Sequence, residues 1–557
     1  MATDNYYLLD YGAGNVRSLV NAVSKLGYTL KTIETASDFE KAEKILFPGV
    51  GAFGYAAEAL VRKGFVEPLR AYLDSGKPFF GICVGMQVLF EGSDESPDAP
   101  GLGYIPGRVR KFSAQDKAVP HMGWNHQTLA KHPAASASND WSYTIDGRQT
   151  YYFVHSYAVP YAALQKDWTL AVTQYDQEQF ISAVQLGNIL CTQFHPEKSG
   201  QAGVNIIKAF LDRPVTVCPP PQALARPTVT PISVPLAHRD GLTTRVIACL
   251  DVRANDQGDL VVTKGDQYDV RERNTATNEV RNLGKPVELA KRYYEEGADE
   301  ITFLNITSFR NVPMHDLPML EVLRQASQTI FVPLTVGGGI RDVTDPDGKA
   351  YPALEVAGEY FRSGADKVSI GSDAVYAAET YWKSSGHLTG RTAIETIAQA
   401  YGAQAVVISV DPRRVYVSDP SQTTHHTVQT RFPGPKGEQY CWYQCTVQGG
   451  REGRDLDVRQ LVVACQALGA GEILLNCMDR DGTNAGYDLE LIADVKAAVS
   501  IPVIASSGAG RVEHFAQVVQ QTGVEATLAA GIFHRREVPI AAVKAHLQQA
   551  KISVRTA

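Results

Sequence analysis

The sequence lacks any hydrophobic run long enough to cross a membrane. Among its 557 residues no apolar stretch approaches the ~18–20 residues that a bilayer-spanning helix needs. An excess of charge of one sign is also missing, since the formal net charge is only −7. This balance gives no reason to predict nucleic acid or an anionic membrane as a partner, and it indicates a soluble globular protein.

Cysteine is scarce as well. The eight cysteines show no C-x-x-C spacing, and the nearest pair, Cys441 and Cys445, has no second pair or histidines at ligand distance. We therefore predict reduced thiols, no disulfide framework, no metal and no cofactor. The N-terminus has neither a basic segment followed by an apolar one nor an Arg/Ser-rich leader, which predicts a cytoplasmic protein.

The length predicts more than one domain, because a single hydrophobic core rarely serves this many residues. A proline-rich stretch without hydrophobic periodicity, "PVTVCPPPQALARPTVTPISVPL", is typical of an extended connector. The predicted organisation is a domain over residues 1–212, a linker over 213–244 and a second domain over 245–557.

Both domains alternate strand-like and helical patterns. In the first, "KILFPGV" precedes a long amphipathic pattern and "KPFFGIC" precedes the helical "GMQVLFEG", which predicts an α/β fold with a parallel sheet. The second domain has eight apolar runs, from "RVIACLDV" to "ATLAAGIF", most of them followed by amphipathic segments. This count predicts a (β/α)₈ (TIM) barrel. Four of its units are matched in order by the next four, with Asp251 ending the first strand and Asp411 the fifth.

A polar insert over residues 413–454 interrupts the barrel pattern after Asp411. A structureless loop of that length is unusual in a compact domain, so we expect a hairpin that includes "QYCWYQCTVQGG". Because it follows a strand end of the barrel, the insert is predicted to lie over the catalytic face, where it could serve as a lid.

Cys83 lies in "FFGICVGMQ", between a strand-like run and a helical one. A buried structural thiol is one interpretation. The other is a nucleophile on a tight turn between strand and helix, with the helix N-terminus stabilising the thiolate. The segment "QFHPEKS" favours the nucleophile: His195 is held extended by Pro196, and Glu197 two residues later is expected on the same face, where it orients the imidazole.

The segments "PGVGAFG", "GICVGMQ" and "FHPEKS" resemble the signatures of class I, triad-type, glutamine amidotransferase domains. This resemblance covers residues 1–212 and implies that Cys83 attacks glutamine, His195 transfers protons and Glu197 orients His195. It also implies an oxyanion hole from backbone amides at Gly49 to Gly51 and Val84. Substrate contacts would come from Gln87 and from the "HSY" run, which holds Ser156 and Tyr157.

In the barrel, catalytic groups belong at the carboxyl ends of the strands. Asp251 and Asp411 occupy two such ends four strands apart, so they are predicted to face each other as acid and base. Glycine-rich strand ends at positions 3/4 and 7/8 predict two phosphate sites on opposite rims. Their residues are Gly338, Gly339, Gly371 and Ser372 on one rim, and Ser507, Gly508, Ala530 and Gly531 on the other.

The second domain resembles the cyclase subunit of imidazole glycerol phosphate synthase of histidine biosynthesis, through "RVIACLDV", "VGGGIRD" and "ILLNCMDRDGTNAGYD". With the fused glutaminase, the chain is similar to the bifunctional enzymes of fungi and plants. The resemblance implies the bis-phosphorylated ribulosyl-formimino aminoimidazole carboxamide ribonucleotide, PRFAR, as acceptor of ammonia. Imidazole glycerol phosphate and the ribonucleotide AICAR would be the products. It further implies ligand contacts from Lys264, Asp481 and Gly482.

Four charged residues begin barrel strands on the opposite face, and they are Arg245, Glu300, Lys367 and Glu472. They could solvate the bottom of the barrel, or they could close a ring; in the family the corresponding residues gate an ammonia passage. Since fusion replaces a subunit contact, a monomer acting on glutamine and PRFAR is expected.

Two positions of the barrel depart from the family. Bacterial cyclases commonly carry Asn at the position of Gly371 and Gly at that of Ser507, so one phosphate site is expected to use backbone amides more and the other a hydroxyl.

Two alternative functions remain open. One is a glutaminase that supplies another sugar-phosphate acceptor, and the other is a non-catalytic metabolite-binding scaffold.

Overall fold

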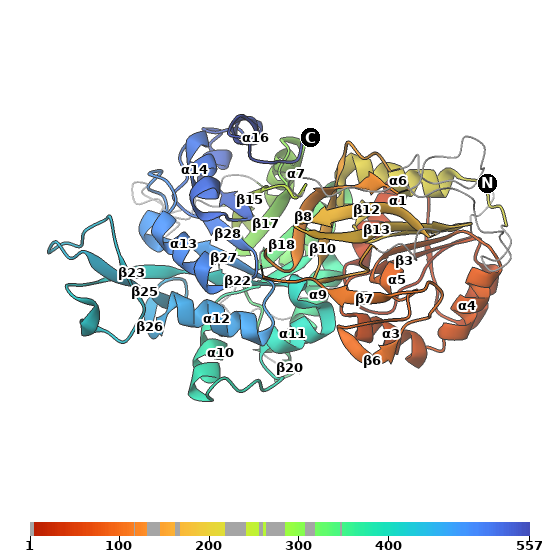
Figure 1. The fold of residues 1–557 in the computed structure, drawn as a ribbon, viewed down its shortest axis with the longest axis horizontal. Helices are drawn as coiled ribbons and strands as arrows, with labels where there is room; N and C mark the ends of the chain where they lie inside the picture. Colours follow the sequence, from red (N-terminus) through yellow and green to blue (C-terminus); the bar gives the residue numbers. More distant parts are fainter. Residues whose placement is uncertain are drawn as a thin grey trace. The chain divides into compact units, whose positions relative to one another are not determined.

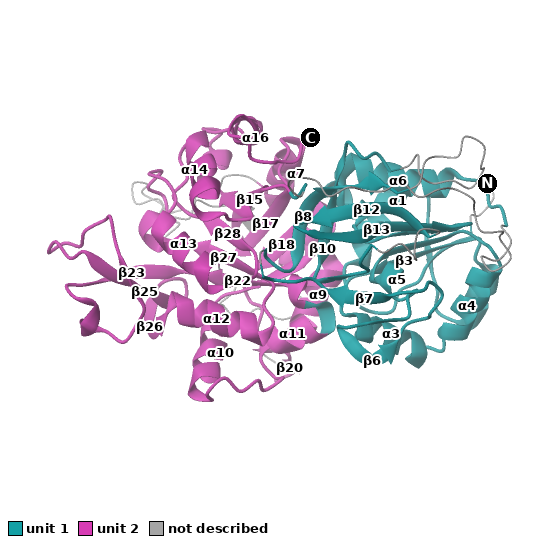
Figure 2. Ribbon diagram, in the orientation of Figure 1, with its two compact units in different colours: residues 1–242, 327–332, 400–402 teal, residues 243–326, 333–399, 403–557 magenta. Residues whose placement is uncertain are grey.

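The computed structural model describes residues 5–115, 117–130, 145–161, 168–217, 241–254, 260–262, 285–306, 318–345 and 348–556. The chain forms two compact units (Figure 2). Unit 1 comprises Met1–Leu242, Ser327–Val332 and Ala400–Gly402; unit 2 comprises Thr243–Ala326, Pro333–Gln399 and Ala403–Ala557. Lys264 and residues 218–240 of the predicted linker lie outside the described residues.

Unit 1 is built on an eight-stranded sheet in the order β2-β1-β3-β4-β14-β13-β12-β9. The first five of these strands run parallel, and β13, β12 and β9 complete the sheet in antiparallel pairing. The strands are β1 (Tyr6–Leu8), β2 (Lys31–Thr32), β3 (Lys44–Gly49), β4 (Phe79–Cys83), β9 (Thr128–Leu129), β12 (Thr169–Tyr175), β13 (Glu178–Leu186) and β14 (Ile189–Thr192). Strands β3, β4 and β14 are buried along their whole length, which accounts for their continuous apolar sequences.

The helices of unit 1 follow the parallel strands as expected for an α/β fold (Figure 1). They are α1 (Val16–Lys25), α2 (Ala36–Lys41), α3 (Phe53–Arg62), α4 (Val66–Asp74), α5 (Val84–Gln87) and α6 (Gly200–Asp212). Helix α5 is a single turn, so the longer helix that we predicted after Cys83 is wrong in extent. A separate ribbon of β8 (His121–His126) and β10 (Thr150–His155) lies in the same unit. Strands β5 (Gly92–Ser93), β6 (Ser96–Pro100), β7 (Arg108–Lys111) and β11 (Tyr157–Ala158) form another small sheet.

Unit 2 is a closed barrel of eight parallel strands, which confirms the predicted fold class. The order is β15-β17-β18-β21-β22-β27-β28-β29, and β29 pairs with β15 to close the ring. The strands are β15 (Arg245–Ala254), β17 (Glu300–Asn305), β18 (Leu334–Gly337), β21 (Lys367–Ile370), β22 (Val406–Val410), β27 (Glu472–Asn476), β28 (Val503–Ser506) and β29 (Ala526–Ala529). Strand β15 runs past Asp251, which we predicted to end it, because it also pairs with β16 (Leu260–Val262).

Most helices of unit 2 connect successive barrel strands, and the last two follow the final strand, β29. They are α7 (Pro286–Glu295), α8 (Pro318–Thr329), α9 (Ala353–Ser363), α10 (Ser372–Lys383), α11 (Ala393–Tyr401), α12 (Val458–Leu468), α13 (Leu489–Ala498), α14 (Val512–Thr522), α15 (Gly531–His534) and α16 (Ile540–Gln549). Inward-facing apolar side chains such as Ile247, Val407 and Leu474 fill the barrel with a continuous core, so the interior is packed with side chains.

The insert after Asp411 folds into a sheet rather than a single hairpin. Strands β23 (Pro412–Val417), β24 (Thr427–Gln429) and β26 (Glu452–Asp457) all pair with β25 (Tyr440–Val447). The predicted strand material is therefore confirmed as its central strand. One end of the sheet contacts the barrel mouth, where Thr446 Oγ1 donates to the carbonyl of Asp411 at 2.6 Å; the other end projects away from the barrel (Figure 1).

No helix in the described ranges is both long enough and apolar enough to span a bilayer.

Candidate active sites

The backbone holds Cys83 in a strained conformation at the end of β4. Its φ is +54° and its ψ −108°, in a region that residues with a side chain rarely adopt. Such strain is characteristic of a nucleophile elbow, where a sharp turn between strand and helix presents one side chain. The side chain of Cys83 is only 4 % exposed, so any reaction of the thiol takes place in a site largely shielded from water.

Three glycines permit this turn, because a side chain at any of them would collide with backbone. A Cβ on Gly85 would lie 2.0 Å from the carbonyl oxygen of Phe47, and one on Gly49 would lie 2.5 Å from the amide nitrogen of Gly85. A Cβ on Gly81 would lie 2.7 Å from the carbonyl oxygen of Gly85. The glycines flanking Cys83 are therefore required by close backbone packing between β3, β4 and α5.

His195 and Glu197 form the second part of this site. His195 follows β14, the strand beside β4, and its Nδ1 lies 2.7 Å from Glu197 Oε1, with both side chains buried. The expected pairing is present, although Glu197 is not in extended backbone as predicted. Pro196 begins a 3₁₀ turn over Pro196–Lys198, because its fixed φ suits a first helical position.

Electrostatics favour a protonated His195. Burial alone would lower its pKa, but the negative charges of Glu197 and Cys83 outweigh burial and raise the pKa of His195 well above its usual value. Its Nε2 is buried and makes no hydrogen bond to a described residue. With Nδ1 bound to Glu197, Nε2 is the atom that can exchange a proton with Cys83 or a substrate.

The residues predicted to hold glutamine are brought together only in part. Gln87 Nε2 donates to the carbonyl oxygen of Tyr157 at 3.0 Å, so Gln87 contacts the "HSY" run. Ser156 in this run is buried. Gly49 pairs with Cys83 across the sheet, and Gly51 has a left-handed φ of +137°. These positions are compatible with an oxyanion hole, which stays a prediction.

Gln193 is a neighbour of the nucleophile that the sequence did not point out. Its Nε2 donates to Cys83 Sγ at 3.4 Å, and its Oε1 accepts from Gln87 Nε2 at 3.0 Å. It precedes His195 by two residues in "QFHPEKS", and that adjacency was the available signal.

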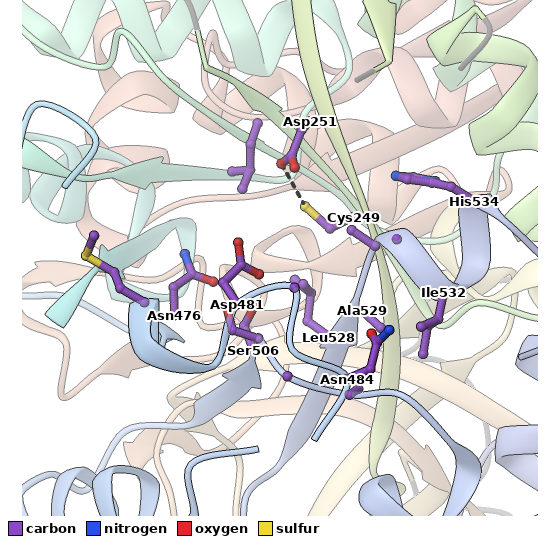
Figure 3. A pocket seen from close by; sticks show the side chains of 18 of the residues that line it. Cys249, Asp251, Asn476, Asp481, Asn484, Ser506, Leu528, Ala529, Ile532 and His534 are labelled. Carbon is purple, nitrogen blue, oxygen red and sulfur yellow. Dashed lines mark hydrogen bonds between the residues drawn. The ribbon is translucent and has the colours of Figure 1, made fainter. Parts of the chain in front are cut away.

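The barrel mouth contains a cavity of about 420 Å³. Asp251 and Asp411 both line it, together with Asp481 and Gly482. Figure 3 shows the side chains of Asp251 and Asp481 in this cavity. The structure thus brings together the two carboxylates that were predicted to face each other and two of the expected ligand contacts. Asn476 Nδ2 donates to Asp411 Oδ1 at 2.9 Å.

The two carboxyl groups differ in their surroundings. Burial, followed by the charges of Asp481 and Asp411, raises the pKa of Asp251 to about 7. Burial also raises the pKa of Asp411, but the hydrogen bond from Asn476 opposes that rise. The donor to Asp251 is the thiol of Cys249, whose Sγ lies 3.9 Å from Asp251 Oδ1 (Figure 3). Because a thiol is a weaker donor than the amide of Asn476, Asp251 is the better candidate for carrying a proton near neutral pH.

The strand ends at positions 7/8 line the same cavity as the aspartates. Ser507, Gly508, Ala530 and Gly531 are all part of its wall. Gly508 has a φ of +98°, and a Cβ there would lie 2.3 Å from the carbonyl oxygen of Gly486. Ser507 has a φ of +71°, which explains why glycine is the easier residue at that position.

The strand ends at positions 3/4 are not among the described residues that line this cavity. Gly338 and Gly339 have left-handed φ values of +99° and +76°, and Gly371 precedes the first turn of α10. The hydroxyl of Ser372 accepts a hydrogen bond from the backbone of Gln448 in the insert at 3.0 Å. The second phosphate site therefore stays a prediction, and Lys264 cannot be placed relative to either site.

His534 is a further cavity residue that the sequence analysis missed. Its Nδ1 is bound to the hydroxyl of Tyr293, and its Nε2 is buried without a hydrogen-bond partner in the described part of the chain. Burial, followed by the positive charges of Arg292 and Arg535, lowers the pKa of His534 to about 4. A neutral imidazole with one free nitrogen beside the 7/8 strand ends suits a ligand contact.

The four charged residues at the strand starts form a closed ring. Arg245 NH1 lies 2.9 Å from Glu300 Oε2, and Lys367 Nζ lies 2.7 Å from Glu300 Oε1 and 2.6 Å from Glu472 Oε2. An ion pair between Arg245 and Glu472 completes the ring. All four side chains are buried, so the alternative that they solvate the barrel bottom is wrong.

The pKa of Glu300 reflects this pairing. Burial alone would raise that pKa, but Lys367 and Arg245 hold it below its usual value. Glu300 is therefore ionised in the folded protein, and losing one member of the ring would leave a buried partner unpaired.

Comparison with known protein families matches two separate ranges of the chain to two families. Residues 7–213 match the family "Glutamine amidotransferase class-I", and residues 245–539 match "Histidine biosynthesis protein". The second match covers more than half of the chain.

Full-length relatives combine both parts. The imidazole glycerol phosphate synthase hisHF proteins of Emericella nidulans and Schizosaccharomyces pombe are each 57% identical to this chain. The first alignment covers 99% of this chain and 98% of the relative, and the second covers 99% of each. The chloroplastic hisHF protein of Arabidopsis thaliana is 53% identical over 98% of this chain and 89% of its own length. The chain therefore belongs to the imidazole glycerol phosphate synthase hisHF family.

Proposed function

We propose that this chain hydrolyses glutamine in unit 1 and uses the ammonia in the barrel of unit 2, converting PRFAR to imidazole glycerol phosphate and AICAR. Family membership supports the overall reaction, in which a glutamine amidotransferase and a cyclase act in histidine biosynthesis. The observation that carries the assignment of residues is that a strained Cys83 and a buried His195–Glu197 dyad follow from neighbouring strands, β4 and β14, of one sheet. Two carboxylates that line one cavity in the other unit complement it.

In the glutaminase step, the Cys83 thiolate attacks the carboxamide carbon of glutamine. The imidazolium of His195 then gives its Nε2 proton to the departing nitrogen, so that ammonia leaves and a glutamyl thioester remains. Neutral His195 next takes a proton from water, the resulting hydroxide attacks the thioester, and glutamate and the thiolate are regenerated. Glu197 holds Nδ1 and keeps Nε2 directed at the reaction throughout.

In the cyclase step, Asp251 and Asp411 move the protons. Ammonia adds to PRFAR, a C–N bond is cleaved to release AICAR, and ring closure yields imidazole glycerol phosphate. A carboxyl group with a pKa near 7 can act as an acid at neutral pH, which suits protonation of the departing nitrogen by Asp251. Asp411 is the complementary base, and Asn476 keeps its carboxylate oriented.

The cavity wall supports one end of the bis-phosphate ligand. Backbone amides at Gly508 and Gly531, with the hydroxyl of Ser507, would bind one phosphate. His534 would donate from Nε2, in the tautomer whose Nδ1 accepts from the hydroxyl of Tyr293. The second phosphate would lie at Gly338, Gly339, Gly371 and Ser372.

The buried ring of Arg245, Glu300, Lys367 and Glu472 is proposed as the gate for ammonia entering the barrel. Ammonia is mostly ammonium in neutral water and then is not nucleophilic, so an enclosed route preserves its reactivity. Both activities reside in one chain, and we propose a monomer. The compartment also stays a prediction: we expect the cytoplasm, although the Arabidopsis relative is named as chloroplastic.

Two matched variants test this division of labour. Cys83→Ala should abolish PRFAR conversion with glutamine while leaving conversion with added ammonium salt. Asp251→Asn should block conversion with both nitrogen sources while the thiol of Cys83 still reacts with glutamine. Loss of both activities in Cys83→Ala, or full cyclase activity in Asp251→Asn, would contradict the assignment. A rate of glutamine turnover that is the same with and without PRFAR would contradict coupling between the sites.

A further inference from the structure

A buried hydrogen-bond chain ends on the sulfur of Cys83. Its last member is Gln193, whose side chain is fully buried and whose Nε2 lies 3.4 Å from Cys83 Sγ. Gln193 Oε1 accepts from Gln87 Nε2 at 3.0 Å. The mechanism above uses neither amide group as a partner of the thiol.

The orientation of both amides follows from the carbonyl of Tyr157. A carbonyl oxygen only accepts hydrogen bonds, so the Gln87 atom 3.0 Å from it must be the donor nitrogen. That nitrogen also donates to Gln193, so the Gln193 atom facing it must be Oε1. The Nε2 of Gln193 is then the atom turned toward Cys83, and the sulfur accepts a hydrogen bond from its N–H group.

Two buried histidines extend the series of hydrogen bonds beyond the same carbonyl. His155 Nδ1 lies 2.9 Å from the Tyr157 oxygen and must donate to it. Its Nε2, 3.2 Å from His121 Nδ1, then accepts, and His121 Nε2 accepts from Asn125 Nδ2 at 3.1 Å. The backbone amide of His126 donates to Asn125 Oδ1 at 2.8 Å and fixes that side chain in turn.

The histidines remain neutral, as this arrangement requires. Burial lowers the pKa of His155 to about 3 and lowers that of His121 well below its usual value. Each ring therefore carries one N–H group, and every hydrogen bond from Asn125 to Cys83 has a defined donor. Such a chain keeps the amide of Gln193 oriented before any substrate binds.

We propose that Gln193 is a catalytic residue of the glutaminase: its amide N–H stabilises the Cys83 thiolate, and the chain through Gln87, Tyr157, His155 and His121 holds it there. This inference rests on the proposed role of Cys83 as nucleophile. A hydrogen bond to a charged sulfur is stronger than one to a neutral thiol, so a fixed donor favours the thiolate.

The other groups near the sulfur are less suited than Gln193 to stabilise the thiolate. Helix α5 has only one turn, so its dipole is too small to carry the stabilisation predicted from the sequence. The hydroxyl of Tyr11, which also senses the charge of Cys83, donates to the carbonyl of Val50 at 2.8 Å. His195, held by Glu197, must give up its proton during turnover, whereas the Gln193 amide keeps its protons throughout.

The same hydrogen bonds determine which atom of Gln87 can bind glutamine. Both protons on its Nε2 are used, one for the carbonyl of Tyr157 and one for Gln193. Its Oε1 is therefore the atom left for a substrate, which fits a donor such as the α-ammonium group. Gln87 thus links substrate binding to the group that stabilises the nucleophile.

The test compares Gln193→Met, which keeps a similar volume and removes the donor, with Gln185→Met in β13 as matched control. In the full-length chain, the rate of Cys83 alkylation by iodoacetamide is measured against pH, with mass spectrometry to identify the labelled cysteine. We expect the midpoint of Gln193→Met to rise by about one pH unit. Its kcat for glutamine hydrolysis should fall about tenfold with KM nearly unchanged, while Gln185→Met behaves like the wild type.

A midpoint and kcat for Gln193→Met equal to those of Gln185→Met would overturn the proposal. A change confined to KM would overturn it as well. If Gln193→Met does not fold, Gln193→Asn, whose shorter side chain withdraws the amide, is measured in the same way. If alkylated Cys83 leaves glutamine hydrolysis intact, the proposed nucleophile itself is wrong, an outcome distinct from failure of Gln193 alone.

Discussion

The two candidate active sites of this chain use different physical strategies. The thiol site is closed and strained: Cys83, His195 and Glu197 are 4 %, 3 % and 3 % exposed, and the turn depends on close backbone contacts. The barrel site is a cavity whose carboxyl groups stay partly accessible. The comparison indicates that a covalent nucleophile needs a rigid position, whereas proton transfer to a large ligand needs space and a tuned pKa.

The largest expected effect comes from replacing one carboxylate by its amide in each site. Glu197→Gln should reduce glutamine-dependent turnover about 10²–10⁴-fold, because His195 loses the anion that orients it and raises its pKa. Turnover with ammonium salt should be unchanged. Asp411→Asn should reduce turnover about 10²–10⁴-fold with either nitrogen source. Steady-state assays with glutamine and with ammonium salt measure both effects. Equal loss of ammonium-dependent turnover in the two variants would contradict the assignment of Glu197 and Asp411 to separate sites.

Close backbone packing at the Cys83 turn should make unit 1 more sensitive than the barrel to an added methyl group, as measured by the free energy of unfolding. Gly85→Ala places a methyl group 2.0 Å from the carbonyl oxygen of Phe47 and should destabilise unit 1 by about 2–3 kcal/mol. Gly371→Ala is the matched control in the barrel, because a Cβ there meets no atom within 4 Å. Urea unfolding of both variants, monitored separately for each unit by hydrogen exchange, measures the difference. Equal stabilities would mean that the elbow tolerates a side chain and is not rigidly packed.

Removal of His534 should weaken binding of the bis-phosphate ligand without affecting glutamine hydrolysis. His534→Ala loses the Nε2 donor, so KM for PRFAR should rise about tenfold, the usual cost of one hydrogen bond to a charged group. His534→Asn, which restores a donor near the same place, should recover part of the affinity. An unchanged KM in His534→Ala would show that the 7/8 strand ends bind phosphate through backbone amides alone.

The smallest effect concerns the raised pKa of Asp251. A carboxyl group whose folded-state pKa is raised stabilises the folded protein fully below its ordinary pKa, and this contribution is lost as pH rises through about 7. Asp251→Asn should therefore match the wild type in stability at about pH 4 and exceed it by about 1–2 kcal/mol at about pH 8, after discounting for water in the open cavity. Thermal unfolding of the barrel at both pH values measures it. Equal stability at the higher pH would place Asp251 in a more polar site than its surroundings imply.

Local patterns in the sequence sufficed for the fold class and for the groups that carry the chemistry. Alternating strand and helix patterns predicted the α/β unit and the closed barrel. A strand that is buried on both faces has a continuous apolar sequence, so each apolar run indicates one such strand. The short motifs around Cys83 and His195 were sufficient because glycine and proline constrain the backbone locally. The same reasoning overestimated helix α5 and assigned extended backbone to Glu197, since neither helix length nor a 3₁₀ turn is set by a few residues alone.

The sequence by itself determined which residues stand at strand starts and strand ends, because strand direction and pleat follow from hydrophobic periodicity. Only the tertiary structure decided which side chains meet. The closed ring of Arg245, Glu300, Lys367 and Glu472 and the free Nε2 of His534 depend on contacts between segments far apart in the chain. So does the orientation of Gln193 toward Cys83, since hydrogen bonds across 110 residues of sequence depend on how strands and loops pack.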